Sequence, residues 1–324
     1  MIKKIVFILL GCLMALPCAA KPPVSFKVTE GKGLMTAAHH VGVENGYFTD
    51  EGQSVHMKKF PKGYAALQDY LQGKADMTTI NRVSLALTDI DPEEHVVIGI
   101  LAYNSNDATI VGRRDSGITD AASLRGKRIG TAYGTTSHYW IYKWLAQHGM
   151  TSSDVTVEYY KKNKLPEVIA SGKVDAIVMG VGVWDKAAKL LGDNAIIFTD
   201  PYIDLKQVPL MVRRSLIRDH RTELIAHLRA LIRAEEFIKN DPRRGAAIVA
   251  QRKNLNLDTV TDLIVNSVDF SLSLKQGLLT DMEIVDRWAI EYKLVQRTRP
   301  RNYLEFIDSS LLEEIDPNRV TIIK

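Results

Sequence analysis

Short apolar runs alternate with helix-like segments from Ser25 to about Phe198. This alternation predicts parallel sheets built from strand–helix–strand units. The predicted strands are Ser25–Thr29, Val55–Phe60, Met77–Ile80, Val96–Leu101, Ala108–Gly112, 128–130, Thr156–Tyr160, Ala176–Met179, Ala195–Phe198 and Gln207–Val212. The helices predicted between them include a first one ending near Asn45, followed by 64–71, 137–148, 165–171 and 183–191. The pattern therefore indicates an α/β protein.

The pattern becomes mostly helical after Val212. Leu216–Lys239 carries apolar residues at helical spacing, and Asp241-Pro242 interrupts it. Proline removes a main-chain donor and clashes with the preceding turn, so a helix is expected to end there. Shorter helices are predicted to follow, which gives the chain a helical C-terminal tail.

One block of the alternating region occurs twice. Leu71–Met77 matches Ala170–Ala176: each closes a helix with glycine, continues with lysine, and places an aspartate just before a short apolar strand. We interpret the two aspartates, Asp76 and Asp175, as caps of local turns rather than as an acid–base pair. A duplicated block predicts two similar lobes with a ligand cleft between them, at the carboxyl ends of the strands.

The length of the chain also fits two lobes. Its 324 residues exceed what one compact core usually holds, and its 46% hydrophobic and 25% charged residues are ordinary for a soluble globular protein. The formal net charge of +4 is small and evenly spread, which argues against nucleic acid as a partner.

The first twenty residues have the pattern of a secretory signal peptide. Lys3 and Lys4 precede an apolar run to Leu16, and small residues then lead to a predicted cleavage after Ala20. Both cysteines, Cys12 and Cys18, lie in this leader, so the mature chain would contain no thiol. Lipidation of either cysteine stays open, although its context favours a free periplasmic protein over a lipid-anchored one.

Residues typical of catalysis or metal binding do not form a known pattern. His39 and His40 are adjacent, so they cannot face one ligand from a helix, and we expect one to be packed and the other solvated. Ser137 and His138 are adjacent too, and no metal-binding or nucleophile-elbow motif is present. The sequence predicts no catalytic residue, no metal site and no cofactor.

The segment from Gly130 to Trp140 is the strongest candidate for ligand binding. A strand ends, Gly134 permits close approach, and the hydroxyl residues Thr135, Thr136 and Ser137 open a helix. Unpaired amides and the positive end of the helix dipole favour an anion at this position. Simple N-capping by one of these hydroxyls explains the same pattern, and both interpretations remain open.

Other loops offer further candidates. Lys32 and Gly33 open the first helix of the opposite lobe, where they offer a cation and main-chain amides, although a tight turn with a solvated lysine is the commoner explanation. Tyr103, Tyr133 and Trp184 lie near strand ends or helix starts and combine an apolar body with a polar tip, which suits a cleft wall. Tyr139 and Trp140 are alternatives that simply pack, and Trp144 is expected in the core.

The ordered motifs resemble those of a known family. Asp115–Ile118, Leu124–Gly130 and Gly134–His138 occur in order, together with the repeated Gly-Lys-x-Asp and the turn at Gly46-Tyr47-Phe48. In these segments the chain resembles the sulfonate-, taurine- and nitrate-binding proteins of ABC importers, within a group that includes thiamine-precursor-binding proteins. The resemblance spans essentially the whole mature chain.

This resemblance implies a type II periplasmic binding protein with two α/β lobes and two crossover strands. It places the crossovers near Tyr103–Asp107 and Asp200–Lys206 and divides the chain into a leader, 1–20, a first lobe, 21–102 plus 207–324, and a second lobe, 103–206. It also implies that the hydroxyls of Thr135 and Thr136, or of Ser137, meet the anionic group.

Two segments depart from the family pattern. Trp184-Asp185-Lys186 stands where members often carry Trp-Glu-Pro, which puts the shape of that wall in doubt. Asn81 and Arg82 replace small residues; Asn81 is a candidate ligand contact, and Arg82 either pairs with an acidic ligand or is a solvated residue at a helix start. The solvated position is the interpretation we favour for Arg82.

The function expected from the resemblance is capture of a small anionic solute for an importer. The implied partners are the solute and the permease subunits, and the protein is expected to be a periplasmic monomer. A ligand-sensing subunit of a signalling system is an alternative that the sequence does not separate. Enzymes of the thiamine-pyrimidine or porphyrin-deaminase type are a weaker alternative, because they depend on cysteines that the mature chain lacks.

Overall fold

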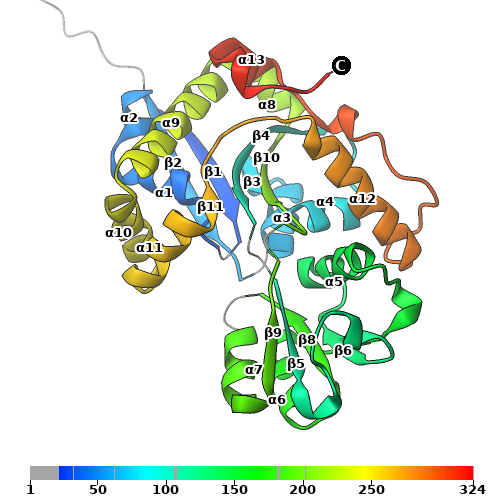
Figure 1. Cartoon of the computed structure of the whole chain (residues 1–324). Coiled ribbons are helices and arrows are strands. Elements are labelled where there is room, and N and C mark those ends of the chain that lie inside the picture. Colours follow the sequence, from blue (N-terminus) through cyan, green and yellow to red (C-terminus); the bar gives the residue numbers. More distant parts are fainter. Residues whose placement is uncertain are drawn as a thin grey trace, which may run out of the picture.

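The computed structural model describes residues 22–31, 33–61, 63–105, 108–180, 183–200 and 202–323. The predicted signal peptide and the candidate Lys32 lie outside the described residues. Within them the chain forms two lobes, each built on its own mixed sheet (Figure 1). This confirms the α/β, two-lobed architecture expected from the sequence.

The first sheet has six strands in the order β11-β4-β10-β3-β1-β2. They are β1 (Val24–Glu30), β2 (Gln53–Lys59), β3 (Met77–Thr79), β4 (His95–Asn104), β10 (Lys206–Arg213) and β11 (Val268–Asp269). Strand β1 runs parallel to β2 and β3, whereas β10 is antiparallel to β3 and β4. The near-continuous burial of β4 and β10 matches their central position in this sheet.

The second sheet repeats this arrangement with five strands in the order β7-β6-β8-β5-β9. They are β5 (Thr109–Arg113), β6 (Arg128–Thr131), β7 (Thr156–Tyr159), β8 (Ala176–Met179) and β9 (Ala195–Phe198). Here β6 runs parallel to β7 and β8, and β5 is antiparallel to β8. Strand β5 follows β4 but lies in the second sheet, and β10 follows β9 but lies in the first, so the chain crosses between the lobes twice.

Helices cover both sheets and form most of the C-terminal part. They are α1 (Ala37–Glu44), α2 (Tyr47–Asp50), α3 (Gly63–Leu71), α4 (Arg82–Leu87), α5 (Thr136–Gln147), α6 (Leu165–Ala170), α7 (Trp184–Leu191), α8 (Arg214–Asp219), α9 (Arg221–Asn240), α10 (Pro242–Lys253), α11 (Leu257–Asn266), α12 (Gly277–Glu291) and α13 (Ser310–Ile315). The helix predicted over 216–239 is interrupted at His220, which separates α8 from α9. Helices α9 and α10 pack on α1, and α12 packs on α4 and reaches α5 of the second lobe.

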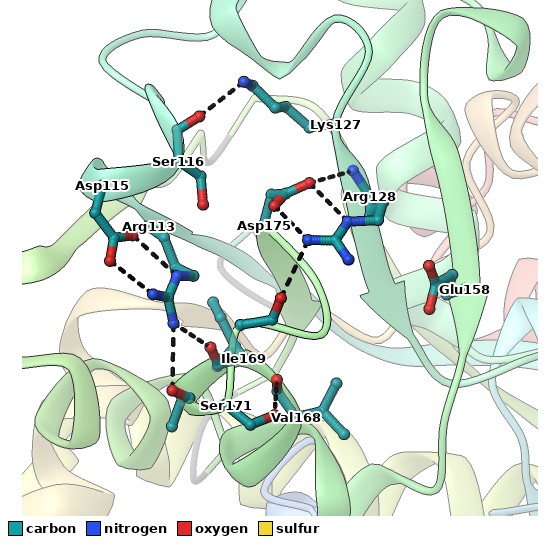
Figure 2. Close-up of polar contacts among 12 residues, drawn as sticks. Arg113, Asp115, Ser116, Lys127, Arg128, Glu158, Val168, Ile169, Ser171 and Asp175 are labelled. Carbon is teal, nitrogen blue, oxygen red and sulfur yellow. Dashed lines mark hydrogen bonds and ion pairs between the residues drawn. The ribbon is translucent and has the colours of Figure 1, made fainter.

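The repeated Gly-Lys-x-Asp block has the same geometry in both lobes. Asp76 exchanges two hydrogen bonds with Lys27 of β1: its amide donates to the carbonyl at 2.9 Å, and its carboxylate accepts the Lys27 amide at 2.7 Å. Asp175 forms the same pair with Arg128 of β6, both at 2.9 Å (Figure 2). These aspartates do not cap local turns, as the sequence suggested: each carboxylate binds the amide of a strand residue that lies 49 or 47 positions earlier in the chain. The Arg128 guanidinium adds a second contact to Asp175, at 2.8 Å.

A second repeat, which the pattern analysis missed, lies at the ends of β5 and β10. Arg113 ends β5 and donates to the carbonyl of Ile169 in α6 at 2.8 Å, and Arg213 ends β10 and donates to the carbonyl of Tyr70 in α3 at 3.5 Å. The arginine that follows each one also donates to a backbone carbonyl, at 3.1 Å and 2.8 Å. The first arginine of each pair thus adds a second donor to a carbonyl at a helix C-terminus, which the amide of Gly172 or Gly73 also bonds, and ties β5 or β10 to a helix of its own lobe.

We predict that Asp76→Ala and Asp175→Ala both destabilise the protein, by about 1–3 kcal/mol, because each leaves a strand amide without its charged acceptor. The loss should be larger for Asp175→Ala, which also removes the partner of the Arg128 guanidinium. Urea unfolding of both variants measures this difference. Asp193→Ala, an exposed aspartate with no hydrogen bond among the described residues, is the control and should change stability little. Equal stability of all three variants would contradict the role of the two carboxylates.

Candidate functional site

Register places the carboxyl ends of both sets of parallel strands at the boundary between the lobes. Thr79 at the end of β3 pairs with Leu210 of β10, the strand that follows the return of the chain from the second lobe. Met179 at the end of β8 pairs with Thr109, the first residue of β5, which has just crossed from the first lobe. The turns that follow β1, β3, β6 and β8 therefore border this boundary, which we call the inter-lobe junction.

The turn between β6 and α5, residues 132–137, is held by its own hydroxyls. Thr135 is the N-cap of α5: its hydroxyl accepts the amide of His138 at 3.3 Å and donates to the carbonyl of Ala132 at 2.7 Å. Gly134 has a φ of +66°, in the left-handed region that favours glycine. A Cβ atom at Gly134 would lie 3.5 Å from Leu87 of the first lobe, so the β6–α5 turn lies against that lobe.

Four donors on the first two residues of α5 have no partner among the described residues. They are the amides and the hydroxyls of Thr136 and Ser137, the first two residues of α5. An α-helix leaves its first amides unbonded, and the capping hydroxyl of Thr135 takes only the third. Both interpretations from the sequence thus apply, to different residues: Thr135 is a cap, whereas Thr136 and Ser137 keep their hydrogen-bonding capacity.

Aromatic rings surround the same turn. Tyr133 is 55% exposed and meets Tyr159 of β7 edge-on, with ring centroids 4.9 Å apart. Trp184, the first residue of α7, is half-buried and packs on the hydrophobic cluster beneath the second sheet. Tyr139, on α5, packs instead into the core of the first lobe, and Trp140 and Trp144 are buried in the second. Tyr133 is therefore the most accessible ring beside the free donors.

Three other candidates lie apart from these donors or are already engaged. Gly33 is exposed in the turn after β1. Asn81 is the N-cap of α4, and its side-chain oxygen accepts the Ser84 amide at 2.8 Å while its NH₂ donates to the Ser84 hydroxyl at 3.0 Å. Tyr103 is 4% exposed and shares a 2.8 Å hydrogen bond with Ser273. Among the described residues, no hydrogen bond joins any of the three to the β6–α5 turn.

Arg82 is not the solvated residue that we favoured from the sequence. It is 4% exposed, and its guanidinium lies 2.9 Å and 3.0 Å from the two carboxylate oxygens of Asp204 and 3.2 Å from Asp281. Lys143 of α5 also reaches Asp204, at 3.2 Å. These four charges come from α4, α5, α12 and the segment between β9 and β10, so they connect the two lobes. A cation buried without such partners is too costly, which explains the correction.

Histidine burial is a second correction. Both His39 and His40 are fully buried, although one was expected in solvent. His40 donates to Glu30 at 2.7 Å, and Lys253 donates to the same carboxylate at 2.7 Å. Glu30 ends β1, so this network fixes the turn that faces the junction from the first lobe. Burial alone would raise the pKa of Glu30, but His40 and Lys253 outweigh it and lower the pKa to about 2.

His138 is a site residue that sequence reasoning missed. Its ring is fully buried, its Nδ1 accepts the Gly134 amide at 3.3 Å, and its Nε2 lies 3.0 Å from the Tyr159 hydroxyl. Trp288 and Tyr292 of α12 each place a ring centroid 5.0 Å from it. Only its adjacency to the hydroxyl run pointed to it, since the partners from α12 are distant in the sequence.

The described residues contain two surface grooves, but no candidate metal site and no membrane-spanning helix. No group of three or more His, Cys, Asp or Glu within the described ranges is arranged to hold a metal ion. No helix in that part of the chain is long and apolar enough to cross a bilayer. Two open grooves of about 550 and 340 Å³ share Arg301 and Asn302, and neither is lined by the β6–α5 turn.

A family comparison decides the group to which this arrangement belongs. Residues 36–245 match the family model described as NMT1/THI5 like. The chain belongs to the NMT1/THI5-like family. This confirms the resemblance inferred from the sequence motifs. A search of curated proteins finds no match.

Solved structures show the same fold as this NMT1/THI5-like chain. The aliphatic sulphonate-binding protein SsuA from Escherichia coli has a TM-score of 0.74 at 15% identity, covering 89% of this chain and 92% of SsuA. The nitrate-binding protein NrtA from Synechocystis PCC 6803 has a TM-score of 0.68 at 14% identity, covering 91% and 89%. A DszB mutant in complex with biphenyl-2-sulfinic acid has a TM-score of 0.64 at 15% identity, covering 89% and 98%.

We predict that Glu30→Gln destabilises this NMT1/THI5-like protein by about 3–5 kcal/mol at pH 7, because Lys253 stays buried without its carboxylate. Since the folded pKa is depressed, the contribution of Glu30 is complete above pH 4.5 and falls as the pH drops toward about 2. Urea unfolding at pH 7 and pH 3 should show the gap between wild type and variant narrowing. Glu44→Gln, an exposed ion pair on α1, is the control and should cost at most about 1 kcal/mol. A pH-independent gap would contradict this role.

We also predict strong coupling between Arg82 and Asp204. Arg82→Met and Asp204→Asn should each cost about 3–5 kcal/mol, since each removes the closest partner of a buried charge and leaves it only the 3.2 Å contact with Lys143 or Asp281. The double variant should cost clearly less than the sum, and urea unfolding of all four proteins measures the difference. Additive losses would show that the two side chains act independently.

Proposed function

We propose that this chain is the solute-binding component of an ABC importer and captures a small anionic solute between its lobes. Membership of the NMT1/THI5-like family and the fold shared with SsuA and NrtA support this proposal. The observation that carries it is the set of four free donors on Thr136 and Ser137, at the inter-lobe junction. A sulfonate, carboxylate or nitrate group has the oxygen atoms that such donors bind.

The donors act together with the dipole of α5. A helix N-terminus stabilises an anion by about 0.3–1 kcal/mol when exposed and by up to ~2 when partly buried. Micromolar affinity needs about 8 kcal/mol, so hydrogen bonds from the turn and apolar contacts must supply the larger share. Tyr133 offers an accessible ring for the apolar part of the solute, and Gly33 and Trp184, from other turns at the junction, complete the proposed site. The hydrogen bonds of the Gly134 amide and of the Thr135 hydroxyl fix the conformation of the β6–α5 turn.

We propose the same lobe division as the sequence analysis, 21–102 plus 207–324 and 103–206. The end of β4 at Asn104 and the start of β10 at Lys206 support it to within a few residues. The proposed location is the periplasm, reached through the leader of residues 1–20, and the proposed partners are the permease subunits. We propose a monomer, because capture between two lobes of one chain requires no second copy.

A second candidate function is favoured by one observation. The fold also matches DszB, whose structure holds an aromatic sulfinic acid. An enzyme acting on such a compound would consume it, whereas a binding protein releases it unchanged. Incubation of purified protein with biphenyl-2-sulfinic acid, followed by chromatography, separates the two: turnover would replace the importer proposal with the enzyme.

We predict that a panel of ethanesulfonate, taurine, nitrate and acetate contains a solute that raises the thermal stability of the protein. A ligand present at 100 times its Kd adds about 2.7 kcal/mol to the free energy of unfolding. The same panel tested on Thr136→Val/Ser137→Ala should give a roughly 10–100-fold lower affinity by calorimetry, because two hydroxyl donors are lost. This double variant keeps the Thr135 cap and should remain folded.

The control for this experiment is Thr156→Val, an exposed threonine at the opposite end of the second sheet with no side-chain hydrogen bond among the described residues. It should bind like wild type. Undiminished affinity of Thr136→Val/Ser137→Ala would reject the assignment of the site.

A further inference from the structure

The imidazole of His138 has a fixed hydrogen-bonding pattern. The Gly134 amide donates to Nδ1 at 3.3 Å, so Nδ1 carries no proton. A neutral imidazole then carries its proton on Nε2, which donates to the Tyr159 hydroxyl at 3.0 Å. Burial lowers the pKa of His138 to about 4, in agreement with a neutral ring.

This pattern determines which amides of the β6–α5 turn face a ligand. The turn begins with Gly134 in the left-handed conformation, and its amide points back toward the His138 ring one helical turn later. The hydroxyl of Thr135 occupies the amide of His138 itself. With these two amides taken, the amides of Thr135, Thr136 and Ser137 are left without a partner among the described residues where α5 begins.

Aromatic rings from both lobes hold the imidazole in place. Tyr133 and Tyr159 of the second lobe lie with ring centroids 5.8 Å and 4.9 Å from it. Trp288 and Tyr292 approach from α12, which packs on α4 of the first lobe (Figure 1). Edge-to-face contacts of this kind restrict ring rotation. The ring that sets the turn is thereby also a contact between the lobes.

We propose that His138 is the positioning residue of the anion site. Its Nδ1 holds the Gly134 amide, and this bond directs the free amides of Thr136 and Ser137 toward the solute. The inference rests on the proposed function, in which those two residues bind the anion. It adds that the shape of the site depends on a neutral imidazole with its proton on Nε2, clamped between the lobes.

The test has one part that needs no ligand. Long-range ¹⁵N–¹H correlation spectra of the imidazole at pH 7 report which nitrogen carries the proton. We expect the Nε2–H tautomer for His138, and an amide resonance of Gly134 that shifts in His138→Phe but is retained in His138→Asn, whose side-chain oxygen can replace Nδ1 as acceptor. An Nδ1–H tautomer or a protonated ring in the wild type would overturn the proposal.

The second part measures binding of ethanesulfonate and nitrate by calorimetry. His138→Phe should lose about tenfold in affinity, which is about 1.4 kcal/mol, whereas His138→Asn should stay within about threefold of wild type. A merely structural role of the ring predicts the reverse order, because phenylalanine preserves the aromatic packing better than asparagine does. His56→Phe, at an exposed position of β2, is the matched control.

The outcomes separate the two proposals. If Thr136→Val/Ser137→Ala weakens binding while His138→Phe binds like wild type, the positioning role is wrong and the proposed site stands. If neither probe binds the wild type, or if the double variant binds normally, the proposed anion site is wrong. The tautomer of His138 still decides the geometry of the turn in that case.

Discussion

The chain crosses between the lobes twice, and the strand that follows each crossing, β5 or β10, runs antiparallel to its neighbour in the sheet that it enters. The arrangement of the junction depends on these two strands. Because β5 and β10 enter antiparallel to β8 and β3, the ends of the parallel strands face the crossing segments. Helix N-termini and turn amides from both lobes are therefore brought to one place. The arginines at the far ends of β5 and β10 bond these strands to α6 and α3, the helices that lie beside them in the same lobe.

The charged groups at the junction are largely neutralised by one another. Arg82 and Lys143 face Asp204 and Asp281, so the guanidinium that the sequence offered as a partner for an acidic ligand is already paired. In the proposed function, recognition of an anion would then depend on neutral donors and on the dipole of α5. Neutral donors bind an oxyanion without a competing counter-charge to displace, and their positions matter more than their number. This is the reason that we assign His138 the role of orienting the β6–α5 turn.

The alternating pattern predicted most strands and helices because each of these elements is defined by neighbours in the sequence. The duplicated block correctly marked Asp76 and Asp175 as equivalent, but their partners, Lys27 and Arg128, lie too far away in the sequence to be found from the local pattern. In the candidate site the same local logic found the hydroxyl run after β6. It did not assign Thr135 to the cap and the next two residues to the free donors, because that division depends on backbone geometry.

The interpretations that failed all concern partners far away in the chain. Arg82 was placed in solvent because its partner, Asp204, lies far along the sequence. One histidine of the His39-His40 pair was also placed in solvent, because the network that buries it includes Lys253, which is far from Glu30 in the sequence. The contact of His138 with both lobes was missed for the same reason, because its partner Trp288 belongs to the last third of the chain. A buried polar side chain is stable only with a partner, so its environment is a property of the tertiary fold. The two turns at the junction show the consequence: the one after β1 is fixed by an ionised carboxylate and the one after β6 by a neutral imidazole, although the lobes share one topology. The duplicated framework therefore determines where the turns lie, and side chains that differ between the lobes determine what each turn can bind.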